Sequence, residues 1–323
     1  MTLDTTLTVP VRDRQKTLNI VTADGVRLAV SDSGPESAEH NVVFLHGLCL
    51  DRNSLARPAA YVRRRYGVET RTIRFDQRGH GQSGSAPMCT YTIDQLADDL
   101  AHVLHLLKVR GTVVLVGHSM GGMAAIRYLQ RPISEQPVKV DGLVLVASAA
   151  GRLAERGIGR LLSTPGVGAL LNAADRVPEP AARAFKGSLG VLLGRWSSRG
   201  VERDATLAEL AATALASTSM RTAAGFLRSL RDMDLLPALG SIEAQTIVIS
   251  GEEDQLTPPA HADDLVAGIP GAVRLDVPGV GHMLPQDAPH VVNEAIRRAM
   301  FGAVSVPDLV ETAPVQSPGG VPA

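Results

Sequence analysis

One serine between two glycines is the residue whose setting points most directly to chemistry. Residues 117–121 read Gly-His-Ser-Met-Gly and fit the pattern Gly-x-Ser-x-Gly, with Ser119 at the centre. An apolar run of strand type ends at Val116 and a helical pattern opens near Met120, so we expect Ser119 on the tight turn between them. Such a turn exposes the hydroxyl and aims a helix N-terminus at it, which favours nucleophilic attack on an acyl carbon.

A serine hydroxyl becomes a good nucleophile only when a base takes its proton and a carboxylate orients that base. In a doubly wound sheet both partners are expected in loops that follow later strands. Of the nine histidines, His282 alone falls just past the last predicted strand, and we interpret it as the base. Three contiguous carboxylates follow the preceding strand. We favour Asp254 because it stands farthest into the loop, with Glu252 and Glu253 as alternatives.

Acyl transfer also needs N–H donors for the oxyanion that forms on the attacked carbonyl. One usual donor is the amide of the residue after the nucleophile, which is Met120 here. The other comes from the loop after the third strand, where His46 and Gly47 end an apolar run. The sequence therefore predicts an oxyanion hole made by the amides of Leu48 and Met120.

Two other kinds of site fit the sequence less well. Residues 79–84 match the dinucleotide pattern Gly-x-Gly-x-x-Gly, but the next helical pattern begins only near Thr92, whereas a dinucleotide loop itself opens the helix. His102 and His105 lie on an amphipathic helical pattern and are more typical of a helix surface than of metal ligands. We therefore predict neither a cofactor nor a metal.

The elements that must position these residues alternate along the chain. Eight apolar, β-branched runs of strand type are separated by helical patterns or turns, which indicates an α/β fold. The runs are 17–23, 27–33, 41–47, 70–76, 112–118, 142–148, 246–251 and 273–279. They predict a mostly parallel sheet with helices on both faces.

A long gap in the strand pattern divides the chain. Between about 150 and 237 alanine, leucine, arginine and glycine predominate, and an insertion of this size between strands is typical of a helical cap. We therefore predict an α/β core from 16–149 and 238–302, with the cap at 150–237. The two ends, 1–15 and 303–323, are expected to be disordered.

Charge and composition exclude several classes of function. A net charge of −1 provides no attraction to nucleic acid or to an anionic membrane. The N-terminus lacks a signal-peptide core, and no apolar run is long enough for a membrane segment. Cys49 and Cys89 cannot build a disulfide framework. We expect a cytoplasmic protein that acts on a small acyl substrate, and the sequence leaves its oligomeric state open.

Together these motifs resemble the α/β-hydrolase fold superfamily, and within it the serine esterase or lipase-like members with a helical cap. The resemblance covers about residues 20–302 and is weak in the predicted cap. The motifs that carry it are His-Gly at 46–47, FDQRGHGQS at 75–83, GHSMGG at 117–122 and GEEDQLTP at 251–258. It implies an eight-stranded sheet with the cap inserted after the sixth strand.

The resemblance also implies the roles of the site residues. Ser119 corresponds to the nucleophile, Asp254 to the acid and His282 to the base, and the amides of Leu48 and Met120 correspond to the oxyanion hole. Epoxide hydrolases and haloalkane dehalogenases, which have aspartate in place of this serine, are a poorer match.

The predicted function is hydrolysis of carboxylic esters through an acyl-enzyme on Ser119. Thioesters and carbon–carbon bonds are alternative substrates, as is peracid chemistry of the cofactor-free haloperoxidase type. A hypothesis from another class is a ligand-binding, receptor-like module with little turnover.

Overall fold

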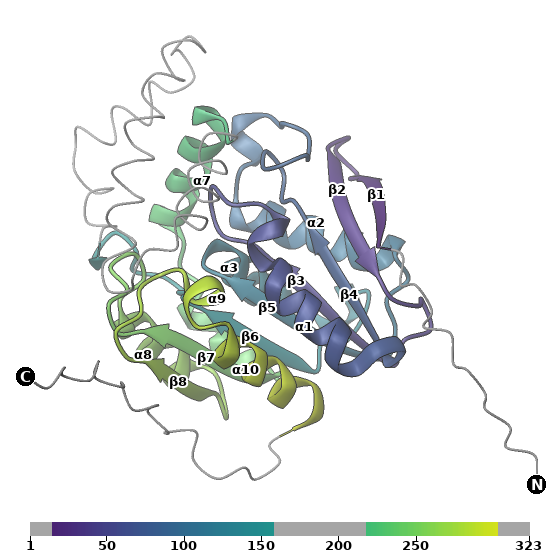
Figure 1. Cartoon of the computed structure of the whole chain (residues 1–323). Helices are drawn as coiled ribbons and strands as arrows, with labels where there is room; N and C mark the ends of the chain where they lie inside the picture. The colour runs from purple at the N-terminus through teal and green to yellow at the C-terminus, as the bar shows by residue number, and fades with distance from the viewer. Residues whose placement is uncertain (1–14, 158–217, 303–323) are drawn as a thin grey trace, which may run out of the picture.

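The strands of this protein form one sheet. The structure, a computed structural model, describes residues 15–157 and 218–302, and within these ranges eight strands pair in the order β1-β2-β4-β3-β5-β6-β7-β8 (Figure 1). The strands are β1 (Lys16–Val21), β2 (Arg27–Ser33), β3 (His40–Leu45), β4 (Thr70–Phe75), β5 (Thr112–His118), β6 (Gly142–Val146), β7 (Gln245–Gly251) and β8 (Val273–Val277). Each lies on a run that the sequence predicts, so the eight-stranded sheet is confirmed.

The sheet is parallel from β4 through β8 and antiparallel at one edge. β3 pairs in parallel with both β4 and β5, whereas β2 runs antiparallel to β1 and to β4. The central strands β3, β5 and β6 are buried along nearly their whole length, because helices cover both faces of a parallel sheet. The edge strands β1 and β8 keep exposed residues.

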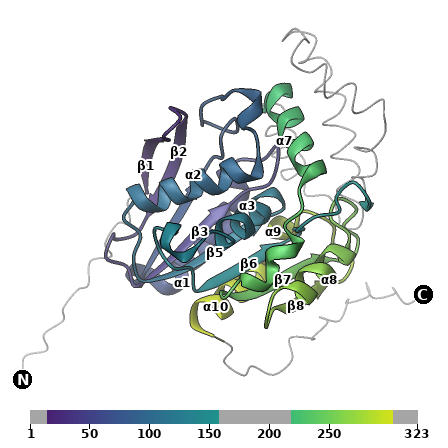
Figure 2. The ribbon, with the colours of Figure 1, turned by 180° about the vertical axis from the view of Figure 1, so that it is seen from behind.

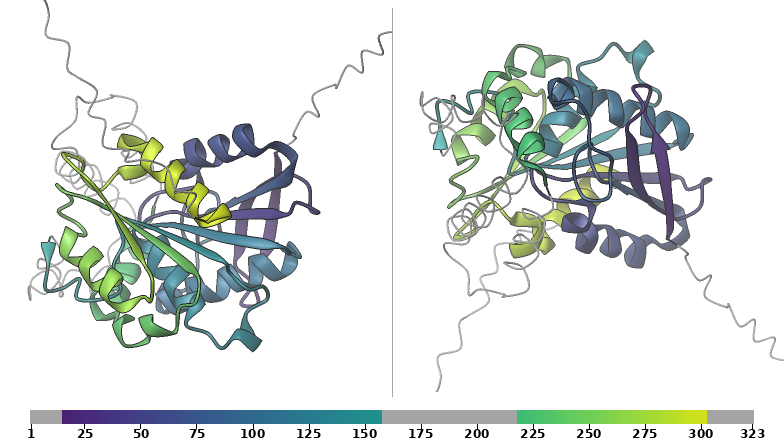
Figure 3. Two further views of the ribbon diagram at one scale, coloured as in Figure 1. Left: turned by 90° about the horizontal axis from the view of Figure 1, so that it is seen from below. Right: turned by 90° about the horizontal axis from the view of Figure 1, so that it is seen from above.

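Helices cover both faces of the sheet. They are α1 (Ala56–Tyr66), α2 (Ile93–Leu106), α3 (Met120–Leu129), α7 (Met220–Asp232), α8 (Pro259–Gly268), α9 (Leu284–Asp287) and α10 (Pro289–Phe301), with short 3-10 turns η1 (Arg52–Leu55), η2 (Gly67–Glu69), η3 (Met88–Thr90), η4 (Ile133–Glu135) and η7 (Leu236–Ser241). Helices α1 and α10 lie on one face, and α2, α3 and α8 lie on the other (Figures 1 and 2). Seen along the sheet, the two layers enclose the strands (Figure 3).

Alternation along β5 gives each face its own hydrophobic core. Val114 and Val116 belong to the core beneath α1 and α10, whereas Val113 and Leu115 belong to the core beneath α2 and α3. This division follows from the two-residue repeat of a strand, whose successive side chains point to opposite faces. The sheet is therefore held on both sides, and its strand ends are fixed supports for loops.

The order of the strands creates a natural place for a site. The chain goes from β3 to β4 on one side of β3, and later enters β5 on the other side. Ligands of open α/β sheets bind outside the carboxyl ends of the strands at such a reversal. The loops after β3, β4, β5, β7 and β8 all leave at this edge, because these strands are parallel.

The chain between β6 and β7 contains the predicted cap. Its described part includes α7, whose Phe226 is buried with its ring centroid 5.1 Å from that of Tyr91. Residues 158–217, most of the predicted cap, lie outside the described residues, as do the two ends of the chain. The cap and the domain boundaries therefore stay predictions.

Candidate active site

Ser119 occupies a strained turn between β5 and α3. Its φ of +52° and ψ of −120° lie in a region that residues other than glycine rarely adopt. Two hydrogen bonds hold the turn: the Ser119 N–H donates to the Val146 carbonyl at 2.9 Å, and the Ser148 hydroxyl donates to the Ser119 carbonyl at 2.9 Å. Strain of this kind is characteristic of functional sites.

β5 continues past Val116, the last residue of its apolar stretch, and ends at His118, as the predicted run 112–118 does. Gly117 and His118 continue the ladder by pairing with Leu145 and Val146 of β6. The strand therefore leads directly into Ser119, and α3 begins at the next residue.

Close backbone packing leaves no room for a side chain at the two glycines of the motif. A Cβ on Gly117 would lie 2.4 Å from the Gly122 Cα, and a Cβ on Gly121 would lie 2.2 Å from the Leu45 carbonyl oxygen. Both neighbours are backbone atoms and cannot move aside independently. The close approach of α3 to β3 and β5 explains why glycines flank Ser119.

Asp254 and His282 form a buried pair. His282 Nδ1 lies 2.8 Å from Asp254 Oδ2, and the Thr257 hydroxyl donates to the same oxygen at 2.7 Å. The N–H groups of Leu256 and Thr257 donate to Asp254 Oδ1 at 2.8 and 2.9 Å. Burial raises the pKa of the Asp254 carboxyl, but His282 and the Thr257 hydrogen bonds outweigh it and hold the pKa below its usual range.

The neighbouring glutamates lie elsewhere. The Glu252 side chain accepts a hydrogen bond from the Gly279 N–H at 3.1 Å, and Glu253 is exposed. Of the three contiguous carboxylates, it is Asp254 that contacts His282, and its role as the acid stays a prediction.

His118 joins the His282 loop to the turn that carries Ser119. Its Nε2–H donates to the His282 carbonyl at 2.9 Å, and the two rings lie 5.0 Å apart. Within the described ranges, no hydrogen bond joins the Ser119 hydroxyl to His282. Hydrogen bonds between a catalytic serine and its base are often long before substrate binds. Because Asp254 is bonded to Nδ1 of His282, Nε2 is the ring nitrogen that can receive the serine proton.

The loop after β3, residues 46–52 and called here the β3 loop, reaches the same place. A Cβ on Gly47 would lie 3.2 Å from the Ser119 Cβ, so the two backbones are adjacent. The Leu50 N–H donates to the Gly47 carbonyl at 3.2 Å, and Cys49 has a φ of +58°. A turn with a positive φ at its third residue is of type II, and its second residue is Leu48.

His118 is a functional candidate that the sequence reasoning did not single out. Its side chain is buried, and burial, followed by the effect of His282, lowers its pKa to about 3. With this low pKa the ring is too weak a base to hold the serine proton, and its Nε2–H is already donated to the His282 carbonyl. Only its place beside Ser119 in the motif could have drawn attention to it.

Acid is expected to destabilise this protein through His118. Its folded pKa of about 3 lies below the ordinary 6.5, so the unfolded chain binds more protons between these values. The free energy of unfolding is therefore not lowered by this group above pH 6.5. As the pH falls from 6.5 toward 3, protonation of His118 in the unfolded chain lowers it by about 1.4 kcal/mol per pH unit. Urea unfolding at about pH 7 and about pH 4.5 should show this loss, and His118→Gln should show a smaller one. An equal loss in both proteins would contradict the assignment.

A metal site and a membrane-spanning helix are both absent from residues 15–157 and 218–302. No group of three or more His, Cys, Asp or Glu side chains there could hold a metal ion. No helix in these ranges has the length and apolar character needed to cross a membrane. The absence of a cofactor and a metal stays a prediction from the sequence.

Comparison with known proteins shows what kind of protein this is. Residues 42–295 match the model of the alpha/beta hydrolase family, which is most of the chain and includes every candidate site residue. The chain belongs to this family. This hydrolase is 29% identical over 266 residues to AB hydrolase superfamily protein YisY of Bacillus subtilis (strain 168), a match that covers 81% of this chain and 91% of YisY.

Two further relatives have more specific names. The hydrolase is 26% identical over 285 residues to 3-oxoadipate enol-lactonase 2 of Acinetobacter baylyi, covering 87% of this chain and 95% of the lactonase. It is similar in fold to the esterase EaEST of Exiguobacterium antarcticum, with a TM-score of 0.72, 23% identity, and coverage of 88% and 99% of the two chains. These matches confirm the predicted family, the fold and the hydrolase class.

Proposed function

We propose that this alpha/beta hydrolase cleaves carboxylic esters through an acyl-enzyme on Ser119. The observation that supports this most is the Asp254–His282 pair, 2.8 Å apart, whose loop is hydrogen-bonded to the residue before Ser119. A strained serine, a histidine and an acid contributed by separate loops at one sheet edge are the parts that acyl transfer needs.

In the first half of the proposed reaction, the Ser119 oxygen attacks the ester carbonyl carbon, and His282 Nε2 takes the hydroxyl proton. The negative charge moves to the carbonyl oxygen, where the Leu48 and Met120 N–H groups donate to it. The tetrahedral intermediate then collapses, and the bond from carbon to the alcohol oxygen breaks. His282 gives its proton to the departing alcohol, and the acyl group stays on Ser119.

In the second half, a water molecule attacks the acyl carbon and gives a proton to His282. The bond from the acyl carbon to Ser119 then breaks, the serine oxygen regains the proton, and the carboxylic acid leaves. Through both halves Asp254 keeps the proton of neutral His282 on Nδ1, so that Nε2 is free to accept.

The names of two similar proteins favour ester cleavage over the other reactions. An esterase and an enol-lactonase, whose names both denote action on an acyl–oxygen bond, match over most of this chain. The proposal therefore includes open-chain esters and lactones, ahead of thioesters, carbon–carbon bonds and peracids.

A substrate panel tests the proposal. We expect the purified protein to hydrolyse p-nitrophenyl esters of short or medium acyl chain or a simple lactone, and to hydrolyse a matched thioester and amide more slowly. It should also react stoichiometrically with a fluorophosphonate, because an activated serine attacks that electrophile readily. A folded protein that reacts with none of these compounds would favour the receptor-like alternative.

A further inference from the structure

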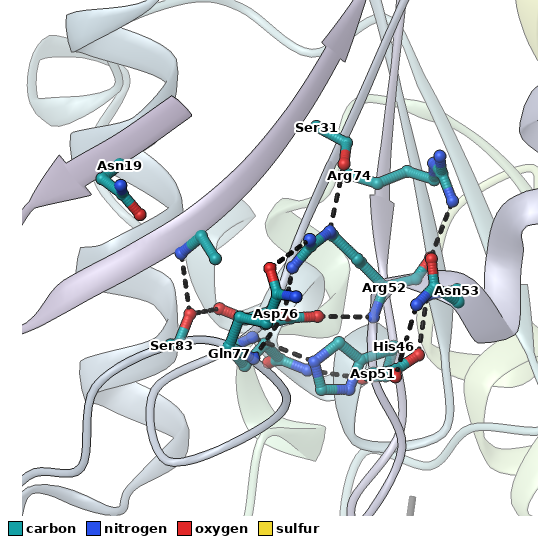
Figure 4. Close-up of polar contacts among 12 residues, drawn as sticks. Asn19, Ser31, His46, Asp51, Arg52, Asn53, Arg74, Asp76, Gln77 and Ser83 are labelled. Carbon is teal, nitrogen blue, oxygen red and sulfur yellow. Dashed lines mark hydrogen bonds and ion pairs between the residues drawn. The ribbon is translucent and has the colours of Figure 1, made fainter. Parts of the chain in front are cut away.

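The loop after β4, residues 76–84 and called here the β4 loop, contains a motif that the proposed reaction leaves without a role. This loop holds the β3 loop at both ends (Figure 4). At the far end, the Arg52 N–H donates to Asp76 Oδ1 at 2.7 Å, and the Arg52 guanidinium forms a buried ion pair with the same carboxylate. The remaining contacts lie on either side of Leu48, whose amide is one of the two proposed oxyanion donors.

On the N-terminal side of Leu48, the contact is made by His46. The Gln77 N–H donates to His46 Nε2 at 2.9 Å, so the ring proton is on Nδ1, which donates to the Gly47 carbonyl at 2.8 Å. The N–H of a trans peptide points opposite to its carbonyl. His46 therefore sets the direction of the Leu48 N–H, which belongs to the same peptide group.

On the C-terminal side of Leu48, the contact is made by His80 of the β4 loop. Its Nδ1–H donates to the Arg78 carbonyl at 3.0 Å, and its Nε2 accepts from the Cys49 N–H at 3.1 Å. Burial lowers the pKa of His80 to about 3, so the ring is neutral and Nε2 keeps its lone pair. The Cys49 N–H belongs to the peptide that follows Leu48.

We propose that His80 is a positioning residue of the oxyanion hole. By accepting the Cys49 N–H it fixes the peptide after Leu48, as His46 fixes the peptide before it, so that the Leu48 N–H cannot turn away from the Ser119 acyl carbonyl. This inference rests on the proposed function. His80 touches no reacting atom, and its effect reaches the substrate only through the β3 loop.

The His80 ring is itself held by packing. Its centroid lies 5.2 Å from that of His46 and 5.5 Å from that of Phe226 on α7. Beside it, a Cβ on Gly79 would lie 2.6 Å from the Thr222 Cγ2, so α7 is seated directly on the β4 loop. The acceptor nitrogen therefore has a fixed position, as a group that orients a backbone amide must have.

Two amide substitutions separate the role of Nε2 from that of the ring as a whole. In His80→Gln the side-chain oxygen can reach the place of Nε2, whereas in His80→Asn the amide reaches only the place of Nδ1. We expect His80→Asn to lower kcat for a p-nitrophenyl ester by about 10- to 100-fold, with KM changed by less than about threefold. His80→Gln should recover most of that loss.

A control variant and a second measurement distinguish positioning from general destabilisation. Tyr128→Phe removes the hydrogen bond of a buried tyrosine to the Val138 carbonyl at the far end of α3 and should leave kcat unchanged. Hydrogen–deuterium exchange over residues 47–52 needs no turnover, and should be faster in His80→Asn than in the wild type or His80→Gln. A folded His80→Asn protein with wild-type kcat would overturn the proposal.

The exchange measurement tests the role of His80 even if the proposed function is wrong. If the wild type hydrolyses no ester, faster exchange confined to His80→Asn still supports His80 as the support of the β3 loop. Unchanged exchange in that variant overturns the inference, whatever the protein's activity.

Discussion

Ser119→Ala is expected to reduce ester hydrolysis by about 10⁶-fold, to the level that binding and the oxyanion donors alone sustain. The loss is this large because nucleophile, base and acid act as one unit, so removal of the nucleophile removes the contribution of all three. The fold should be unaffected, since the Ser119 hydroxyl has no hydrogen-bond partner within the described ranges and alanine adopts the same backbone conformation at similar cost.

Steady-state kinetics on the best ester of the panel would measure this loss. Intact-mass analysis after fluorophosphonate treatment should show one adduct on the wild type and none on Ser119→Ala. Persistent labelling of the variant, or hydrolysis within about tenfold of the wild type, would mean that another residue is the nucleophile.

Asp254→Asn is expected to lower kcat by about 10⁴-fold while the protein stays folded. Asp254 Oδ1 accepts two backbone N–H groups, so the single oxygen of asparagine will occupy that position. Its NH₂ group then faces His282 and donates to Nδ1. This moves the ring proton to Nε2, where it blocks acceptance of the serine proton.

The matched control for this variant is Glu253→Gln, which changes charge in the same loop at an exposed side chain. It should retain wild-type kcat within about twofold, whereas Asp254→Asn loses activity at every pH tested. The reverse pattern would assign the acid to Glu253. Circular dichroism on both variants would separate a loss of activity from a loss of fold.

The sequence predicts much of the fold because the relevant signals are local. β-branched runs mark each strand, and the crowding beside Ser119 requires glycines that are visible in the pattern itself. His282 can be predicted as the base from the sequence because it follows the last predicted strand. Asp254 could be preferred over its neighbours only from its place in the loop, and the structure adds the two backbone N–H groups that hold it.

Sequence reasoning assigns no positioning role to His46, His80 or His118, because these side chains act on backbone that is distant along the chain. His46 and His80 are separated by more than thirty positions, yet their rings hold the two peptides that flank Leu48. His118 bonds to a carbonyl 164 positions away. No periodicity or spacing reports such contacts, because they depend on which loops meet once the sheet has formed.

The order of the site residues along the chain has a consequence for synthesis on the ribosome. Ser119 and its elbow are synthesised well before the proposed base, which follows β8. A nascent or prematurely terminated product that ends before residue 282 carries the alcohol without the imidazole that activates it. Under the proposed mechanism, hydrolytic capacity is thus acquired only after residue 282 has been synthesised, and fragments that end before it should be inert toward esters.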